Sequence, residues 1–113
     1  MTYTFTIPKR AVSWNALYAG KHWAHRAKMA KEWHDETLVA VRKAKIPKLN
    51  GTYHITVTAY AVRPLDADNI CAKVIIDGLK GLVLPDDTAK YIRSVTLIPV
   101  KAKEDWVEVT IDE

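Results

Sequence analysis

Hydrophobic and polar residues alternate with a period of two in several stretches of this chain, a pattern typical of half-buried β-strands. In the first stretch, Tyr3, Phe5 and Ile7 alternate with threonines, and a proline follows. The predicted strands cover residues 2–7, 53–61, 91–100 and 106–111. A charged turn over residues 101–105 joins the last two strands.

Apolar residues recur every three or four positions between about residue 22 and residue 45, which predicts a long amphipathic helix. A polar, turn-rich connection over residues 9–20 precedes it, and residues 47–51 break it. Its other faces are charged. The apolar stripe consists of Trp23, Ala27, Ala30, Trp33, Thr37, Val41 and Ala44.

A second helix is predicted from residue 68 or 69 to residue 80, with Asp68 as its N-cap and Gly81 as its stop. Apolar residues surround nearly its whole circumference, which indicates a helix that is buried on most sides. Asn69, Lys73 and Asp77 follow one another at four-residue steps and form one polar line along it. The simplest interpretation of this line is a capping residue followed by a Lys73–Asp77 ion pair at the protein edge.

The order β-α-β-α-β-β predicts a single α+β domain over residues 1–113. The composition, with 49% apolar and 27% charged residues, is typical of a folded protein of this length. One cysteine, Cys71, allows no internal disulfide and too few ligands for a cysteine-based zinc site. Since no apolar run is long enough for a membrane span and no signal-peptide pattern is present, we expect a cytoplasmic protein that does not enter a membrane.

Lysines and arginines outnumber acidic residues 17 to 13, and the net charge of +4 favours an anionic partner such as nucleic acid. The densest basic region is interleaved with Trp14, Tyr18 and Trp23, a composition that suits phosphate contacts and base stacking. The candidate DNA contacts in this region are Lys9, Arg10, Lys21, His22, His25, Arg26, Lys28 and Lys31. The alternative is a solvated helix face whose tryptophans belong to the core.

Five aspartates lie within residues 62–87 of this basic chain. Asp66 and Asp68 follow the strand at 53–61, and in extended backbone their carboxylates would project to the same side. Asp86 and Asp87 lead into the next strand. If the two strands are neighbours, both acid pairs could lie at the same edge of the sheet. Each pair alone is also consistent with a turn or a helix cap.

Carboxylates that lie close together need a cation to neutralise them, and their oxygens suit Mg²⁺ or Mn²⁺. We therefore predict a metal site formed by Asp66, Asp68, Asp86 and Asp87. A metal-binding acid cluster in a basic protein favours phosphoryl transfer on a nucleic acid. In that reaction Lys73 would stabilise the charge that grows on the phosphate.

The run "DADN", then a lysine, then "DGL" and "LPDD", resembles the signature of the RusA family of Holliday junction resolvases. The positions that match the family's metal-binding carboxylates and essential lysine are Asp66, Asp68, Asp87 and Lys73. Asp77 and Asp86 match the neighbouring acids, and Asn69 belongs to the same motif. Lys73 stands five residues after Asp68, whereas four is the commonest family spacing.

Near the start of the chain, "VSWNALY" resembles the family's Ser and Asn loop and adds Ser13 and Asn15 to the candidate DNA contacts. The resemblance implies a mixed sheet packed with two helices. It also implies a magnesium-dependent endonuclease, of phage or prophage origin, that resolves four-way DNA junctions in recombination and repair. A twofold homodimer would make the paired nicks that resolution requires.

Three alternatives stay open: a noncatalytic nucleic-acid-binding protein with the same fold, a nickase that cuts branched DNA without resolving it, and a metal-dependent phosphatase or nucleotide hydrolase.

Overall fold

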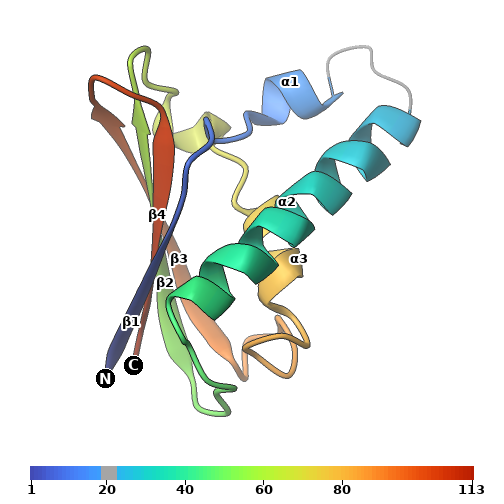
Figure 1. Ribbon diagram of the computed structural model, residues 1–113, viewed down its shortest axis with the longest axis vertical. Helices are drawn as coiled ribbons and strands as arrows, with labels where there is room; N and C mark the ends of the chain where they lie inside the picture. The colour runs from blue at the N-terminus through green and yellow to red at the C-terminus, as the bar shows by residue number, and fades with distance from the viewer. Residues whose placement is uncertain (19–22) are drawn as a thin grey trace.

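A computed structural model describes residues 1–18 and 23–113, and in these residues four strands form one mixed sheet with the helices on one of its faces (Figure 1). This arrangement confirms the predicted α+β domain. The strands are β1 (Thr2–Ile7), β2 (Tyr53–Ala61), β3 (Ile92–Lys101) and β4 (Trp106–Asp112). The helices are α1 (Trp14–Tyr18), α2 (Trp23–Lys43), the 3₁₀ turn η1 (Ala67–Asn69) and α3 (Lys73–Leu79).

The strands lie in the order β1-β4-β2-β3, and the pair β2 and β3 is the parallel one. Tyr53 at the start of β2 lies beside Ile92 at the start of β3, and Ala61 lies beside Lys101 at their ends. Asp66 follows the end of β2, whereas Asp87 precedes the start of β3. The two acid pairs therefore flank opposite ends of this strand pair, and the expectation that they share one edge of the sheet is wrong.

The two chain ends lie side by side at one end of the sheet. Because β1 pairs antiparallel with β4, Thr2 lies opposite Asp112, and the N-terminal ammonium is 3.7 Å from a Glu113 carboxylate oxygen (Figure 1). The last strand is thus an interior strand of the sheet, between β1 and β2.

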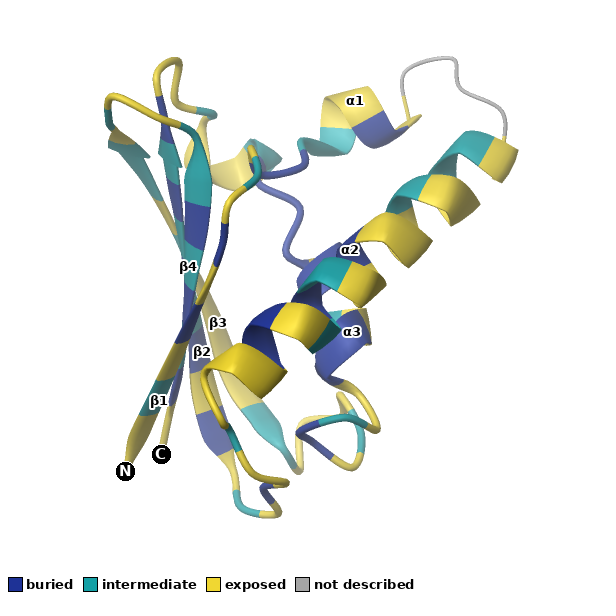
Figure 2. Cartoon of the chain, in the orientation of Figure 1, coloured by how far each residue is buried: buried dark blue, intermediate teal, exposed yellow. Residues whose placement is uncertain are grey.

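The period-two pattern gives the sheet one apolar and one polar face. On β2, Ile55, Val57 and Ala59 face the helices and are buried, while the residues between them are partly exposed on the open face. Helix α2 covers this apolar face only with its second half, where Trp33, Thr37 and Val41 are buried (Figure 2). None of the helices in the described ranges is long and apolar enough to cross a membrane.

The first half of α2 extends beyond the sheet, so the apolar stripe predicted for this helix meets the core only over its second half. Trp23 is 65% exposed, and Ala27 and Ala30 are exposed as well. The spacing of the stripe is helical throughout, but the core reaches only as far as the sheet does (Figures 1 and 2). Trp23 is therefore a surface residue.

The predicted second helix is interrupted. Residues 67–69 form η1, Ile70 is extended, and α3 begins only at Lys73, with Ala72 as its N-cap. Ile70 pairs with Ser13 in an isolated antiparallel bridge, and the Cys71 amide donates to the Val12 carbonyl at 2.8 Å. These bonds replace helical ones, so Asp68 is not a helix N-cap and Asn69 is not in line with Lys73.

The stop of the second helix is confirmed, since Gly81 follows the C-cap of α3 with a φ of +80°, a conformation that glycine adopts at low cost. A short helix, α1, also forms inside the predicted polar connection. The Ser13 hydroxyl accepts a hydrogen bond from the Ala16 amide at 3.0 Å, as an N-cap does, and Leu17 is buried. Trp14 packs against the core.

Replacing Gly78 with alanine should destabilise the fold by about 1–2 kcal/mol. A Cβ at Gly78 would lie 3.1 Å from the Thr37 Cβ where α3 crosses α2, and this overpacking outweighs the gain in helix propensity. Urea unfolding measures the change. In a Thr37→Ala background the penalty should shrink, because two of the three nearest atoms are gone. A more stable Gly78→Ala protein would contradict this close packing.

Candidate functional site

A pocket of about 310 Å³ lies between α3 and β3, and we call it the α3–β3 pocket. Its lining is mostly apolar, with three charged side chains. The lining residues are Trp14, Ile70, Ala72, Lys73, Ile76, Asp77, Asp87, Ile92, Val95 and Leu97. Three predicted site residues, Lys73, Asp77 and Asp87, are therefore brought to one pocket from α3 and from the loop that precedes β3.

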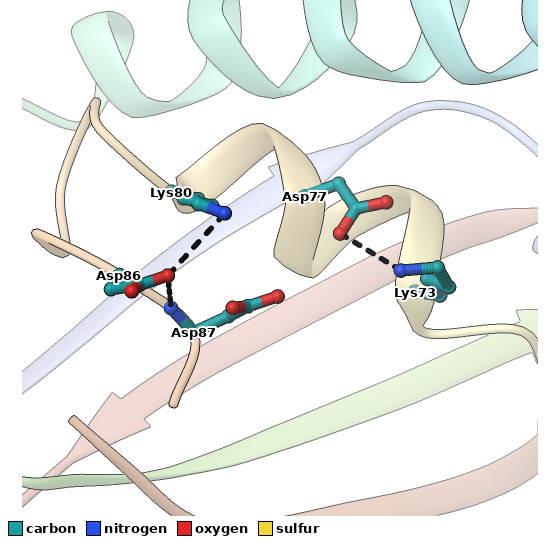
Figure 3. Close-up of polar contacts among 5 residues, drawn as sticks. All are labelled: Lys73, Asp77, Lys80, Asp86 and Asp87. Atoms are coloured by element: carbon teal, nitrogen blue, oxygen red, sulfur yellow. Dashed lines mark hydrogen bonds and ion pairs between the residues drawn. The ribbon is translucent and has the colours of Figure 1, made fainter. Parts of the chain in front are cut away.

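Lys73 and Asp77 are successive side chains on one face of α3. The Lys73 Nζ is 3.3 Å from the Asp77 Oδ1, the i, i+4 pairing predicted from the sequence (Figure 3). Both side chains are well exposed, so their pairing contributes only about 0.3–0.5 kcal/mol to stability. The two residues also line a second hollow of about 140 Å³, together with Tyr18 and Arg26.

Asp86 and Asp87 have different environments, although they are neighbours. The Asp86 Oδ1 accepts the Asp87 backbone N–H at 2.8 Å and lies 3.4 Å from the Lys80 Nζ. The bond from this backbone N–H, with the Lys80 contact, lowers the pKa of Asp86. Asp86 thus holds its own loop in place, whereas the Asp87 side chain extends toward the Lys73–Asp77 pair (Figure 3).

Asp66 and Asp68 lie apart from this group in the described part of the chain. Both are exposed, Asp66 just before η1 and Asp68 within it, and neither lines the α3–β3 pocket. Asn69, at the end of η1, accepts the Asn15 backbone N–H on its Oδ1 at 3.2 Å. Its observed role is to join η1 to α1, and the same contact places Asn15 beside η1.

The metal prediction meets the structure only in part. Within residues 1–18 and 23–113, no three Asp, Glu, His or Cys side chains converge closely enough to hold a metal ion. A cage made of Asp66, Asp68 and Asp87 therefore does not fit this arrangement. Mg²⁺, however, usually keeps several waters and takes one or two carboxylates plus substrate phosphates. The oxygen donors of these aspartates fit that looser mode.

Several predicted DNA contacts have partners within the protein. The Lys9 Nζ is 3.9 Å from a Glu32 oxygen and 5.1 Å from the centre of the Trp33 ring. Arg10 donates to the Arg63 carbonyl at 3.0 Å and lies 4.0 Å from Asp105. These two side chains fasten loops together, which leaves less of their charge available for phosphates.

Further along the basic region, Lys28 is exposed on α2, His25 is half-buried there, and Lys31 forms an i, i+4 pair with Asp35 at 3.0 Å. The Arg26 guanidinium lies 4.9 Å from the centre of the Tyr18 ring. Lys21 and His22 lie outside the described residues.

Sequence reasoning missed the apolar part of the pocket. Val95 and Leu97 lie opposite Ile55 and Val57 in the register and so face the helices, yet Val95 is 41% exposed. The alternation of β3 contained the signal that these side chains point inward. The alternation could not indicate the length of α3, which at seven residues leaves part of β3 uncovered.

We searched protein-family models and curated proteins for relatives of this chain, and neither search found a match.

Proposed function

We propose that this protein is a magnesium-dependent endonuclease that cuts branched DNA, chiefly four-way junctions. The observation that carries the proposal is the meeting of Lys73, Asp77 and Asp87 at the rim of one pocket. A cation and carboxylates within reach of one bound phosphate are the groups that phosphodiester hydrolysis requires. The proposal also rests on the spacing of the acidic motif in the sequence.

In this proposal Lys73 donates to a phosphate oxygen and stabilises the charge that grows there during cleavage. Asp77 holds the Lys73 ammonium in position through the 3.3 Å contact. Asp87 and the two aspartates near η1 would supply oxygen ligands for the ion. Mg²⁺, or Mn²⁺, when bound with the substrate, would activate water and neutralise the phosphate.

We place the enzyme in the cytoplasm of a bacterial host, encoded by a phage or prophage, in DNA recombination and repair. It would act as a homodimer, because resolution needs two nicks in strands of like polarity and the described part of one chain brings one such group of residues together. Lys28 and Arg26, on the half of α2 that projects beyond the sheet, would hold the DNA backbone.

A noncatalytic junction-binding protein is the second candidate. It is favoured by the finding that the described residues contain no preformed group of three metal ligands. A binding protein would use the same net charge of +4 and would not need the carboxylates.

A labelled four-way junction incubated with Mg²⁺ or with EDTA separates these functions. We expect binding in both conditions and paired nicks only with Mg²⁺, and a cruciform plasmid should become linear within one binding event. Linear duplex of the same sequence is the control and should not be cut. Tight junction binding without metal-dependent nicks would establish the binding protein instead, and single nicks alone would establish a nickase.

A further inference from the structure

We infer that the α3–β3 pocket binds one unpaired nucleobase of the DNA, next to the phosphate held by Lys73. This inference rests on the proposed function and names the part of the substrate that fills the pocket. The volume of about 310 Å³ is at the lower end of the range for small-molecule sites, about 300–1,000 Å³. A pocket of this size suits a single ring system, not a longer stretch of DNA.

The walls of the pocket provide a site for a flat apolar ring. Trp14 from α1 contributes an indole, and Val95 and Leu97 from β3 contribute aliphatic side chains. The Trp14 ring stacks on Tyr18 at a centroid distance of 6.0 Å and an interplanar angle of 18°. Arg26 lies over Tyr18 in turn, so the Trp14 ring belongs to a stack of three side chains. A ring held in such a stack loses little freedom when a base stacks on it.

The helix-facing side of β3 leaves apolar surface exposed that a bound ligand would cover. Ile55 and Val57 are fully buried, whereas Val95, beside Ile55 and on the same face of the sheet, is 41% exposed. Helix α3, which is seven residues long, leaves this side chain partly uncovered. A base in the pocket would remove apolar surface of Val95 and Leu97 from water, a favourable change.

The charges at the rim distinguish a nucleotide from other apolar ligands. The Lys73 ammonium offers donors to a phosphate, while the Asp77 carboxylate beside it offers only acceptors, which match the N–H groups at base edges. A lipid chain would offer no partner to the Lys73 ammonium beyond Asp77, and a free phosphate would leave the apolar walls empty. A nucleotide satisfies both, with its phosphate at Lys73 and its base inside.

A four-way junction that carries an unpaired 2-aminopurine at its branch point tests this inference with the full chain. The measurement is made in EDTA, so that it reports binding without cleavage. We expect the 2-aminopurine fluorescence to be quenched as the base stacks on Trp14. Val95→Phe, which fills the pocket from an exposed position, should abolish the quenching. Ile98→Phe is the matched control: Ile98 is 40% exposed on the opposite face of β3, so quenching should persist.

A second measurement uses Trp14→Leu and a junction in which the unpaired base is replaced by an abasic site. The substitution should weaken binding of the intact junction by about 5- to 150-fold, the range for loss of one stacked base. It should leave binding of the abasic junction unchanged. Circular dichroism and thermal unfolding of Trp14→Leu establish that the variant is folded.

Equal quenching in Val95→Phe and Ile98→Phe, or equal weakening of both junctions by Trp14→Leu, would overturn the inference. Halving of the particle mass by Val95→Phe in light scattering, with quenching unchanged, would overturn it too, since the pocket would then be covered by a second copy. These outcomes are independent of cleavage. A protein that quenches 2-aminopurine but never nicks DNA loses the proposed nuclease activity and keeps the base site.

Discussion

Asp87→Asn is expected to slow junction cleavage by about 100-fold or more, because removing one carboxylate charge from such a site costs several kcal/mol in the transition state. Asp87 is the candidate ligand that lines the pocket beside Lys73 and Asp77. Single-turnover cleavage with Mg²⁺ measures the rate. Junction binding in EDTA should be equal or tighter, since one negative charge is removed from a surface that meets phosphates.

Asp35→Asn is the matched control for this change. Asp35 is an exposed aspartate on α2 that pairs with Lys31 and does not line the α3–β3 pocket. The charge change is the same, so a general electrostatic effect would appear in both variants. Near wild-type cleavage by Asp87→Asn, or an equal loss in Asp35→Asn, would remove Asp87 from the site. The same comparison applied to Asp66 and Asp68 tells whether the acids near η1 act with it.

Trp33→Ala should lower the free energy of unfolding by about 3–5 kcal/mol. The indole of Trp33 is 2% exposed and is among the largest fully buried side chains of the core. Since domains of this size are stable by only about 5–15 kcal/mol, such a loss removes a large part of the margin. Urea unfolding followed by circular dichroism at several temperatures measures it.

Trp23→Ala serves as the comparison for Trp33→Ala, because both tryptophans belong to α2 and to the same predicted stripe. Trp23 is 65% exposed, so its loss should change stability by no more than about 0.5 kcal/mol. Equal losses in the two variants would mean that the first half of α2 packs against something in solution. Little loss in Trp33→Ala would contradict the core described for this chain.

The strands and α2 could be predicted from the sequence because their signals are local. Alternation over residues 53–61 needs only neighbouring side chains, and β2 has the predicted bounds. The direction of pairing is not local. Nothing in residues 91–100 distinguishes a parallel from an antiparallel partner for β2, and that choice decides which loops meet. The predicted closeness of Asp66 and Asp87 depended on it.

The interruption of the second helix had a similar cause. Its residues favour a helix on composition, but Ile70 and Cys71 are fully buried and take backbone partners from residues 12 and 13. Tertiary contacts outweighed local propensity there. The Lys73–Asp77 pair was predictable, since i, i+4 contacts depend on one turn of helix. The apolar pocket beside this pair was not predictable, because it forms where the short helix α3 leaves part of β3 uncovered.

The interior position of β4 has a consequence for the order in which the sheet is built. β1 finds its partner in β4, so residues at the start of the chain pair with residues more than 100 positions later, as Thr2 does with Asp112. While the ribosome makes the intervening segments, β1 has no neighbour and β2 lacks one of its two. Contacts of such long sequence separation slow folding and leave strand edges open to other chains. Chaperone binding to the nascent chain would protect it most before β4 emerges.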